Sequence, residues 1–273
     1  MPSSVATRKK TRLNSPFARQ VLSMFAGVGG RKYFVDLAAN HPTDGSSTYE
    51  LEKSGWNGLC IEPNPQYANL LRTQRKCRLS QAAIDSVERN VTFRFMGTMG
   101  GIEDERFDNR PSVSLHDAPP STTLRTRLLA DVLRSESAPR NIHYFSLDVE
   151  GAEDAVLPPW FPWDSYIFYT LSIERPPPAL NARLFQHGYL FVQNFGVDTF
   201  YVHRTHPLAS RFKALETNAS FLQVPAKCKN LHAKNRAGLV YRDRVPLRTP
   251  CSSIFGCCAW PGYPPRTTRY GAV

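Results

Sequence analysis

The sequence lacks an apolar run long enough to cross a membrane. Its longest candidate, Val21 to Val28, is far shorter than the 18 or so residues that a spanning helix needs. The chain also lacks an internal repeat and a pair of C-x-x-C motifs, so no structural zinc site is predicted. Its 41% hydrophobic and 11% aromatic residues can still fill a sizeable core, which excludes a wholly disordered protein.

Acidic residues are absent from the first 35 positions. Residues 1–35 contain seven basic residues, residues 36–204 contain 16 basic and 21 acidic residues, and residues 205–273 contain eleven basic and two acidic residues. The net charge of +11 therefore belongs to two flanks around a mildly acidic middle. Such charge favours an anionic partner, but the flanks show no regular basic–aromatic interleaving and the middle shows no RNA-binding module. We therefore do not expect nucleic acid as the partner.

The middle of the chain alternates short strands with short helices, which predicts an α/β fold with a mostly parallel sheet and helices on both faces. We divide the chain into a basic, flexible segment (1–30), a domain (31–204) and a basic, partly irregular extension containing Cys and Pro (205–273). The strands are expected at 33–37, 58–62, 81–84, 144–148 and 169–174, with helices at 48–54, 65–75, 123–135 and 152–157 and a final hairpin at 189–193 and 199–202.

Acidic residues stand at or near the carboxyl ends of four expected strands. They are Asp36, Glu62, Asp148 with Glu150, and Glu174. The carboxyl ends of parallel strands form the edge where ligands bind, so these side chains are expected to lie close together. Any one of them could instead cap a neighbouring helix. Four at one edge favour a binding or catalytic site.

The dinucleotide fingerprint G-x-G-x-x-G is absent, and Gly27-Val-Gly-Gly30 precedes the first strand as an expected loop. Small residues follow Asp36, which lets a ligand approach the backbone. Glu62, 26 residues later, can accept hydrogen bonds from both hydroxyls of a ribose. A ribose without a pyrophosphate site favours S-adenosylmethionine over NAD.

Several sequence blocks together resemble the FkbM-type methyltransferases, over residues 32–204. The most specific are Glu62-Pro-Asn-Pro65 and Ser146-Leu-Asp-Val-Glu-Gly-Ala-Glu153. The others are Asp36-Leu-Ala-Ala-Asn40, Ser47-Thr-Tyr-Glu-Leu-Glu-Lys53, Gly55-Trp-Asn-Gly58, Ala82-Ala83, Ser172-Ile-Glu174, Gly188-Tyr189 and Asp198-Thr-Phe-Tyr201. The resemblance implies a class I methyltransferase fold, whose seven-stranded sheet ends in a hairpin with an antiparallel strand. It also implies O-methylation of a hydroxyl on a sugar, lipid or small molecule, with S-adenosylmethionine as methyl donor.

The resemblance also assigns roles to individual residues. Asp148, Glu150 and Glu153 are the implied catalytic residues, and Asp36, Ala38, Asn40, Glu62, Ala83 and Asp85 the implied cofactor-binding residues. In FkbM-type methyltransferases, the loop that follows the first strand commonly carries glycine where this chain has Ala38. The crowded carboxylates of Asp148 and Glu150 are candidate bases, because crowding raises the pKa of one of them. A divalent cation between them is the alternative, although the sequence identifies no third ligand.

Other segments leave two interpretations open. Pro158–Trp163 could stack on an acceptor or pack at a helix end, and Arg175 could bind an acidic acceptor or a neighbouring acid. His143 is expected to be structural, and the stretch from Gly97 to Asn109 a surface loop or insertion. Cys257 and Cys258, near Cys251, are expected to be free thiols.

Three other functions compete with methyl transfer to a hydroxyl. They are a basic nucleic-acid-binding protein or RNA methyltransferase that uses the flanks, a non-catalytic nucleoside sensor and an NAD oxidoreductase. We expect a cytoplasmic location, with organelle targeting by the basic start as the alternative. Sequons at Asn90 and Asn218 matter only in a secretory compartment.

Overall fold

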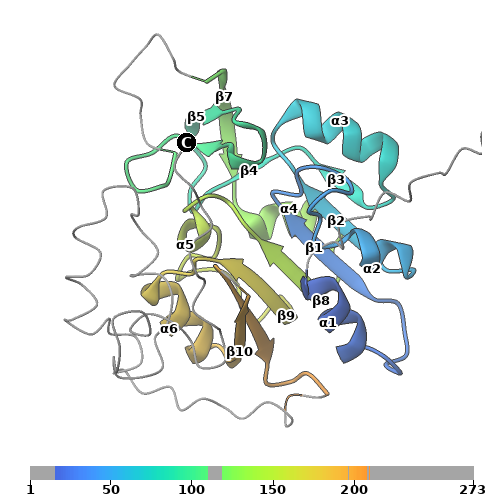
Figure 1. The fold of residues 1–273 in the computed structure, drawn as a ribbon. Coiled ribbons are helices and arrows are strands. Elements are labelled where there is room, and N and C mark those ends of the chain that lie inside the picture. Colours follow the sequence, from blue (N-terminus) through green and yellow to red (C-terminus); the bar gives the residue numbers. More distant parts are fainter. Residues whose placement is uncertain (1–15, 110–118, 196, 208, 210–273) are drawn as a thin grey trace, which may run out of the picture.

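The computed structural model describes residues 16–109, 119–195, 197–207 and 209. A seven-stranded sheet of order β10-β11-β9-β8-β1-β2-β3 forms its centre, with helices on both sides (Figure 1). Strands β3, β2, β1, β8 and β9 are parallel, whereas β11 is antiparallel to both β9 and β10, so the sheet is mixed. The α/β architecture predicted from the alternation of strands and helices is confirmed.

The large sheet consists of β1 (Tyr33–Leu37), β2 (Asn57–Ile61), β3 (Arg78–Ser80), β8 (Asn141–Leu147), β9 (Ile167–Glu174), β10 (Tyr189–Phe195) and β11 (Asp198–His203). The helices are α1 (Pro16–Met24), α2 (Tyr49–Lys53), α3 (Pro65–Gln74), α4 (Leu129–Ser135), α5 (Glu153–Val156) and α6 (Pro178–Gln186). A second sheet contains β4 (Ala83–Ile84), β5 (Asn90–Arg94), β6 (Gly101–Ile102) and β7 (Ser121–Arg127), and η1 (Gly97–Met99) is a 3₁₀ turn.

Two apolar clusters hold the layers together, one on each face of the large sheet. Helices α1, α2 and α3 bury side chains such as Val21 and Leu71 in one cluster together with Phe34 of β1. Helices α4, α5 and α6 bury side chains such as Leu133 in the other cluster, with Val35 of the same strand. Parallel strands are buried on both faces, which explains why β1 and β2 read as nearly continuous apolar runs.

The N-terminal boundary expected at residue 31 falls inside the packed fold. Helix α1 buries Phe17, Val21 and Met24, and Phe25 directly after it is 2% exposed. Within the segment expected to be flexible over residues 1–30, the described part therefore contains a packed helix from Pro16 to Met24. The cue is the apolar spacing of Phe17, Val21 and Met24, which the basic residues around it obscure.

The second sheet corrects two predicted elements. The helix expected from Thr123 begins only at Leu129, because residues 121–127 form β7 and pair with β5. Three threonines favour the extended conformation there, and the partner strand β5 was not predicted. The strand expected at 81–84 is replaced by β3, which ends at Ser80, and by β4 in the small sheet.

A disulfide joins Cys60 of β2 to Cys77, which directly precedes β3. The sequence analysis did not predict this bond. Cys251, Cys257 and Cys258 lie outside the described residues, as does the extension from residue 210 onward. In the described part of the chain, no helix is both long and apolar enough to cross a membrane.

Candidate functional site

A cavity of about 910 Å³ opens at the carboxyl ends of β1, β8 and β9. Four predicted acids line it: Asp36, Asp148, Glu150 and Glu174. Asp44 and Asp198 also line it, and none of the described residues that line it is Lys, Arg or His. The cavity wall is therefore strongly acidic, as the positions at the strand ends predicted.

A second, narrower pocket adjoins this cavity. Glu62 and Asn64 form its polar side, and Ala83, Phe93 and Ile102 belong to its apolar lining. Leu37, Ala38 and Asn40 line both spaces, so the loop after β1 lies between them. A ligand with an apolar ring, a hydroxylated middle and a charged end could extend from one space into the other.

The loop after β1 has a strained backbone. Ala38 and Asn40 have φ angles of 59° and 51°, in the left-handed region that costs a residue with a side chain free energy. The amides of Ala38 and Ala39 both donate hydrogen bonds to the carbonyl of Ile61, at 3.0 and 3.3 Å. Strain of this kind gathers at ligand sites, where the surrounding structure maintains it.

Glu62 fixes the other side of this loop. Its side chain accepts a hydrogen bond at Oε2 from the Asn40 amide at 2.9 Å and at Oε1 from the Asn64 amide at 2.8 Å. Burial raises the pKa of Glu62 to about 7, although both backbone hydrogen bonds oppose the rise. Each carboxylate oxygen keeps a lone pair for a ligand hydroxyl.

Arg75 supports the cavity wall from behind. Its buried guanidinium donates hydrogen bonds to the Pro42 carbonyl at 3.1 Å and to Thr48 Oγ1 at 2.9 Å. The Thr48 hydroxyl in turn donates to Asp36 Oδ2. Burial raises the pKa of Asp36, and the positive charge of Arg75 opposes this rise. The sequence analysis placed Arg75 at the end of a helix and gave it no role.

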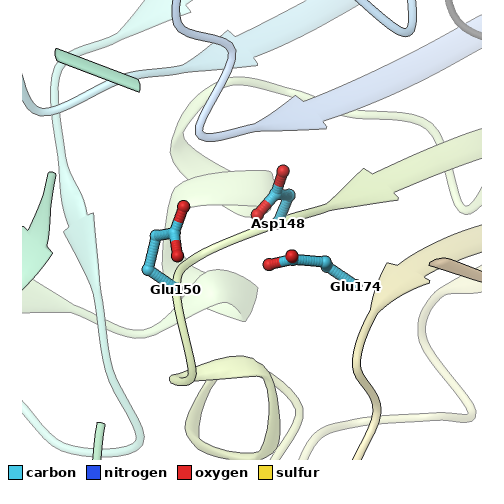
Figure 2. A group of neighbouring side chains, drawn as sticks. All are labelled: Asp148, Glu150 and Glu174. Atoms are coloured by element: carbon cyan, nitrogen blue, oxygen red, sulfur yellow. The ribbon is translucent and has the colours of Figure 1, made fainter. Parts of the chain in front are cut away.

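Asp148, Glu150 and Glu174 point their carboxylates toward one another (Figure 2). One oxygen from each lies within 4.8 Å of the others, a separation that could hold a metal ion. The side chain of Asp148 opens onto the cavity. Burial among protein atoms raises its pKa well above the usual value, and the neighbouring Glu174 adds to the rise.

Asp198 adds a fourth acid to the group of Asp148, Glu150 and Glu174. The sequence analysis quoted Asp198 only as part of a motif. It begins β11 and is paired in register with Glu174 of β9. Burial raises its pKa to about 7, and the negative charge of Glu174 contributes. The antiparallel hairpin thereby brings an acid from the far end of the domain into the cavity.

Arg175 pairs with neighbouring acids, which is one of the two interpretations left open by the sequence. Its Nη2 lies 3.0 Å from Glu150 Oε2 and 2.6 Å from Glu174 Oε2, and its Nη1 pairs with Asp108. Burial alone would lower the pKa of Arg175, but the hydrogen bond to Glu174 and the surrounding acids raise it. Both Arg175 and Glu150 adopt positive φ angles, of 43° and 54°.

The stretch from Gly97 to Asn109, expected as a surface loop or insertion, reaches this site. The Asp108 amide donates a hydrogen bond to the Glu150 carbonyl at 3.0 Å, and Thr98 and Met99 line the large cavity. This stretch belongs to the small sheet, whose strand β5 was not predicted, and it brings Asp108 to Arg175.

A comparison with known protein families identifies the family of this chain. The model of the methyltransferase FkbM domain matches residues 36–188, more than half of the chain. The chain belongs to this family. A search among curated proteins found no matching sequence. Family membership makes the chain a methyltransferase and implies S-adenosylmethionine as its methyl donor.

Two residues assigned through the FkbM resemblance lie behind the surface of the site. Glu153 is fully buried, and its Oε1 accepts hydrogen bonds from the amides of Val149 and Gly151 at 3.2 and 3.1 Å. It therefore shapes the loop that carries Asp148 and Glu150 and lines neither space. Asp85 likewise lines neither space and accepts a hydrogen bond from Arg89 Nε at 2.7 Å.

The remaining predicted residues of this FkbM domain lie away from the site. The His143 ring accepts a hydrogen bond from the Tyr33 amide at 3.1 Å, and burial lowers its pKa to about 4. Phe161 and Trp163 pack on each other, and Trp163 stacks on His187. The 158–163 segment lines neither the large cavity nor the narrow pocket, so the packing interpretation of it fits the structure.

Proposed function

We propose that the chain transfers a methyl group from S-adenosylmethionine to a hydroxyl oxygen of a small-molecule, lipid or glycan acceptor. The observation that carries this proposal is the loop 37–40, which borders both the narrow pocket and the acidic cavity. The donor would place its nucleoside in the narrow pocket, and its reactive end would face Asp148 and Glu150.

The residues of the narrow pocket fit a nucleoside. Glu62 retains acceptor capacity for two ribose hydroxyls, and Ala83 and Ile84 leave an apolar space for a base. Asp36, Ala38 and Asn40 face the larger cavity, where the amino-acid part of the donor carries its positive charges. The acidic wall suits a donor of net positive charge. This arrangement supports the assignment of a class I methyltransferase site.

The bound donor supplies an electrophilic methyl group that a nucleophile displaces in line. The chain's own task is to hold the acceptor oxygen in that line, which can contribute of order 7–11 kcal/mol. A carboxylate that removes the hydroxyl proton could add roughly 10²–10⁴-fold. Asp148 is the best-placed candidate, because it opens onto the cavity while Arg175 holds Glu150 and Glu174.

The charge of the cavity supports an acceptor without phosphate groups. In the part of the chain that the structure describes, six carboxylates and no basic side chain line it, so a phosphodiester would be repelled at this wall. This observation counts against an RNA substrate, which the basic flanks alone would favour. A divalent cation held by Asp148, Glu150 and Glu174 stays a hypothesis, and Arg175 already occupies one oxygen of each glutamate.

A methyl-transfer screen tests the proposal. The full chain is incubated with donor labelled in its methyl group and with pools of glycans, lipids, hydroxylated small molecules and RNA, with and without a chelator. We expect label in a hydroxyl-bearing, phosphate-free pool. Label in RNA, or NAD binding tighter than that of S-adenosylhomocysteine in calorimetry, would overturn the proposal. Loss of transfer on chelation would support the cation.

A further inference from the structure

The disulfide constrains where this chain folds. Cys60 is fully buried within β2, and Cys77 lies 17 residues later at the entrance to β3. Disulfides form and persist in oxidising compartments and are rare in the cytosol, where thiols are kept reduced. A bond from β2 to the residue before β3 therefore indicates folding in an oxidising compartment. The same compartments of eukaryotic cells attach glycans to sequons.

The sequon Asn90-Val91-Thr92 lies on β5 in a suitable arrangement. Side chains alternate along the strand, so Val91 and Phe93 are buried in a small apolar cluster while Asn90 and Thr92 are exposed. Asn90 and Thr92 thus share the solvent face of the strand. No hydrogen bond of the described residues uses the amide side chain of Asn90.

The surroundings of Asn90 leave room for a bulky polar group. Its neighbours across the strand pair, Arg125 opposite Asn90 and Thr123 opposite Thr92, are also exposed. None of these four side chains lines the large cavity or the narrow pocket. A glycan at Asn90 would therefore cover the outer face of the small sheet and leave access to the site unchanged.

We propose that the chain matures in an oxidising, glycan-attaching compartment and that Asn90 carries an N-linked glycan. In this step the Asn90 amide nitrogen forms a bond to the anomeric carbon of an oligosaccharide delivered on a polyprenyl diphosphate. The bond from that carbon to the phosphate oxygen breaks, the lipid diphosphate leaves and the amide gives up one proton. The inference goes beyond the proposed methyl transfer and does not depend on it. It also replaces the expectation of a cytoplasmic location.

The first test uses the full chain isolated from its own cells, lysed with a thiol-blocking alkylating agent. Non-reducing digestion and mass spectrometry are expected to show Cys60 and Cys77 linked. Treatment with an amide-cleaving glycosidase in ¹⁸O-water is expected to convert Asn90 into labelled aspartate. Alkylated Cys60 and Cys77, or an unmodified Asn90 beside an intact disulfide, would overturn the proposal.

The second test expresses full-length variants in the same cells and compares gel mobility before and after the glycosidase. Thr92→Ser keeps the sequon, whereas Thr92→Val and Asn90→Gln destroy it. We expect a glycosidase-sensitive shift attributable to Asn90 in the unmodified chain and in Thr92→Ser. Thr92→Val is matched in shape and β propensity, so its loss of the shift would report the hydroxyl requirement rather than misfolding. A shift that persists fully in Asn90→Gln would refute the assignment.

Discussion

Replacing Glu62 with glutamine tests the link between the narrow pocket and the methyl donor. The carboxylate already accepts hydrogen bonds from the Asn40 and Asn64 amides, and it would also accept the ribose hydroxyls. A glutamine has only one acceptor oxygen, so at least one of these interactions is lost. A hydrogen bond to a charged group is worth about 1.5–3 kcal/mol. At about 1.4 kcal/mol per factor of ten, we expect Kd for S-adenosylhomocysteine to rise roughly 10- to 150-fold.

The assay is a calorimetric titration with S-adenosylhomocysteine, accompanied by thermal unfolding to confirm that Glu62→Gln is folded. Glu136→Gln is the matched control, because Glu136 forms an ion pair with Arg78 and lines neither space. We expect the affinity of this control to match that of the unmodified chain. An affinity of Glu62→Gln within about twofold of that of the unmodified chain would refute the ribose role.

The pH dependence of the same titration gives a second readout. Burial raises the pKa of Glu62 to about 7 in the free protein, and ribose binding requires the ionised carboxylate. Affinity is therefore expected to be greatest above pH 7 and to weaken as the pH falls below 7 and Glu62 is protonated. The Glu62→Gln variant should lack the part of this pH dependence that comes from residue 62. An affinity of the unmodified chain that stays flat between about pH 6 and pH 8 would contradict the argument.

Three further predictions test other parts of the domain. Asp148→Asn should abolish methyl transfer while S-adenosylhomocysteine still binds, as calorimetry would show, and a fully active variant would exclude Asp148 as the base. Ala38→Gly should raise the free energy of unfolding by about 0.5–1 kcal/mol in urea, because glycine tolerates the left-handed φ; a loss of stability would contradict this. Deleting residues 1–30 should lower the free energy of unfolding by several kcal/mol and yield insoluble protein, because Phe17, Val21 and Phe25 are buried. Deleting residues 1–14 removes none of these side chains. A soluble, fully stable 1–30 deletion would refute the packing role of α1.

The predicted order of strands and helices holds best where local pattern and tertiary packing agree. β1, β2, β8 and β9 are largely apolar runs with an acid at or next to the carboxyl end, so both their positions and their shared edge could be predicted. The sequence 121–135 could not be resolved in the same way. Its leucines fit a helix, and only pairing with β5, which lies about 30 residues earlier, makes residues 121–127 extended.

The acidic residues of the candidate site could be predicted from the sequence, but the contacts that connect them to other residues could not. Asp36, Glu62, Asp148 and Glu174 follow from the strand ends alone. Arg75, Asp108 and Asp198 enter through long-range contacts: a guanidinium behind a loop, a loop of the second sheet and a hairpin antiparallel to β9. Periodicity carries no information about such pairings, since they depend on how separate elements meet.

Arg175 shows why these connections matter for the chemistry. Four carboxylates crowd the end of the cavity, and like charges at this distance would disfavour ionisation of them all. Arg175 pairs with Glu150 and Glu174 and leaves Asp148 facing the open space. Asp108 of the inserted loop completes the pairing of Arg175. The small sheet therefore contributes to the electrostatic order of the site, although the acids that line the cavity come from the large sheet and its loops.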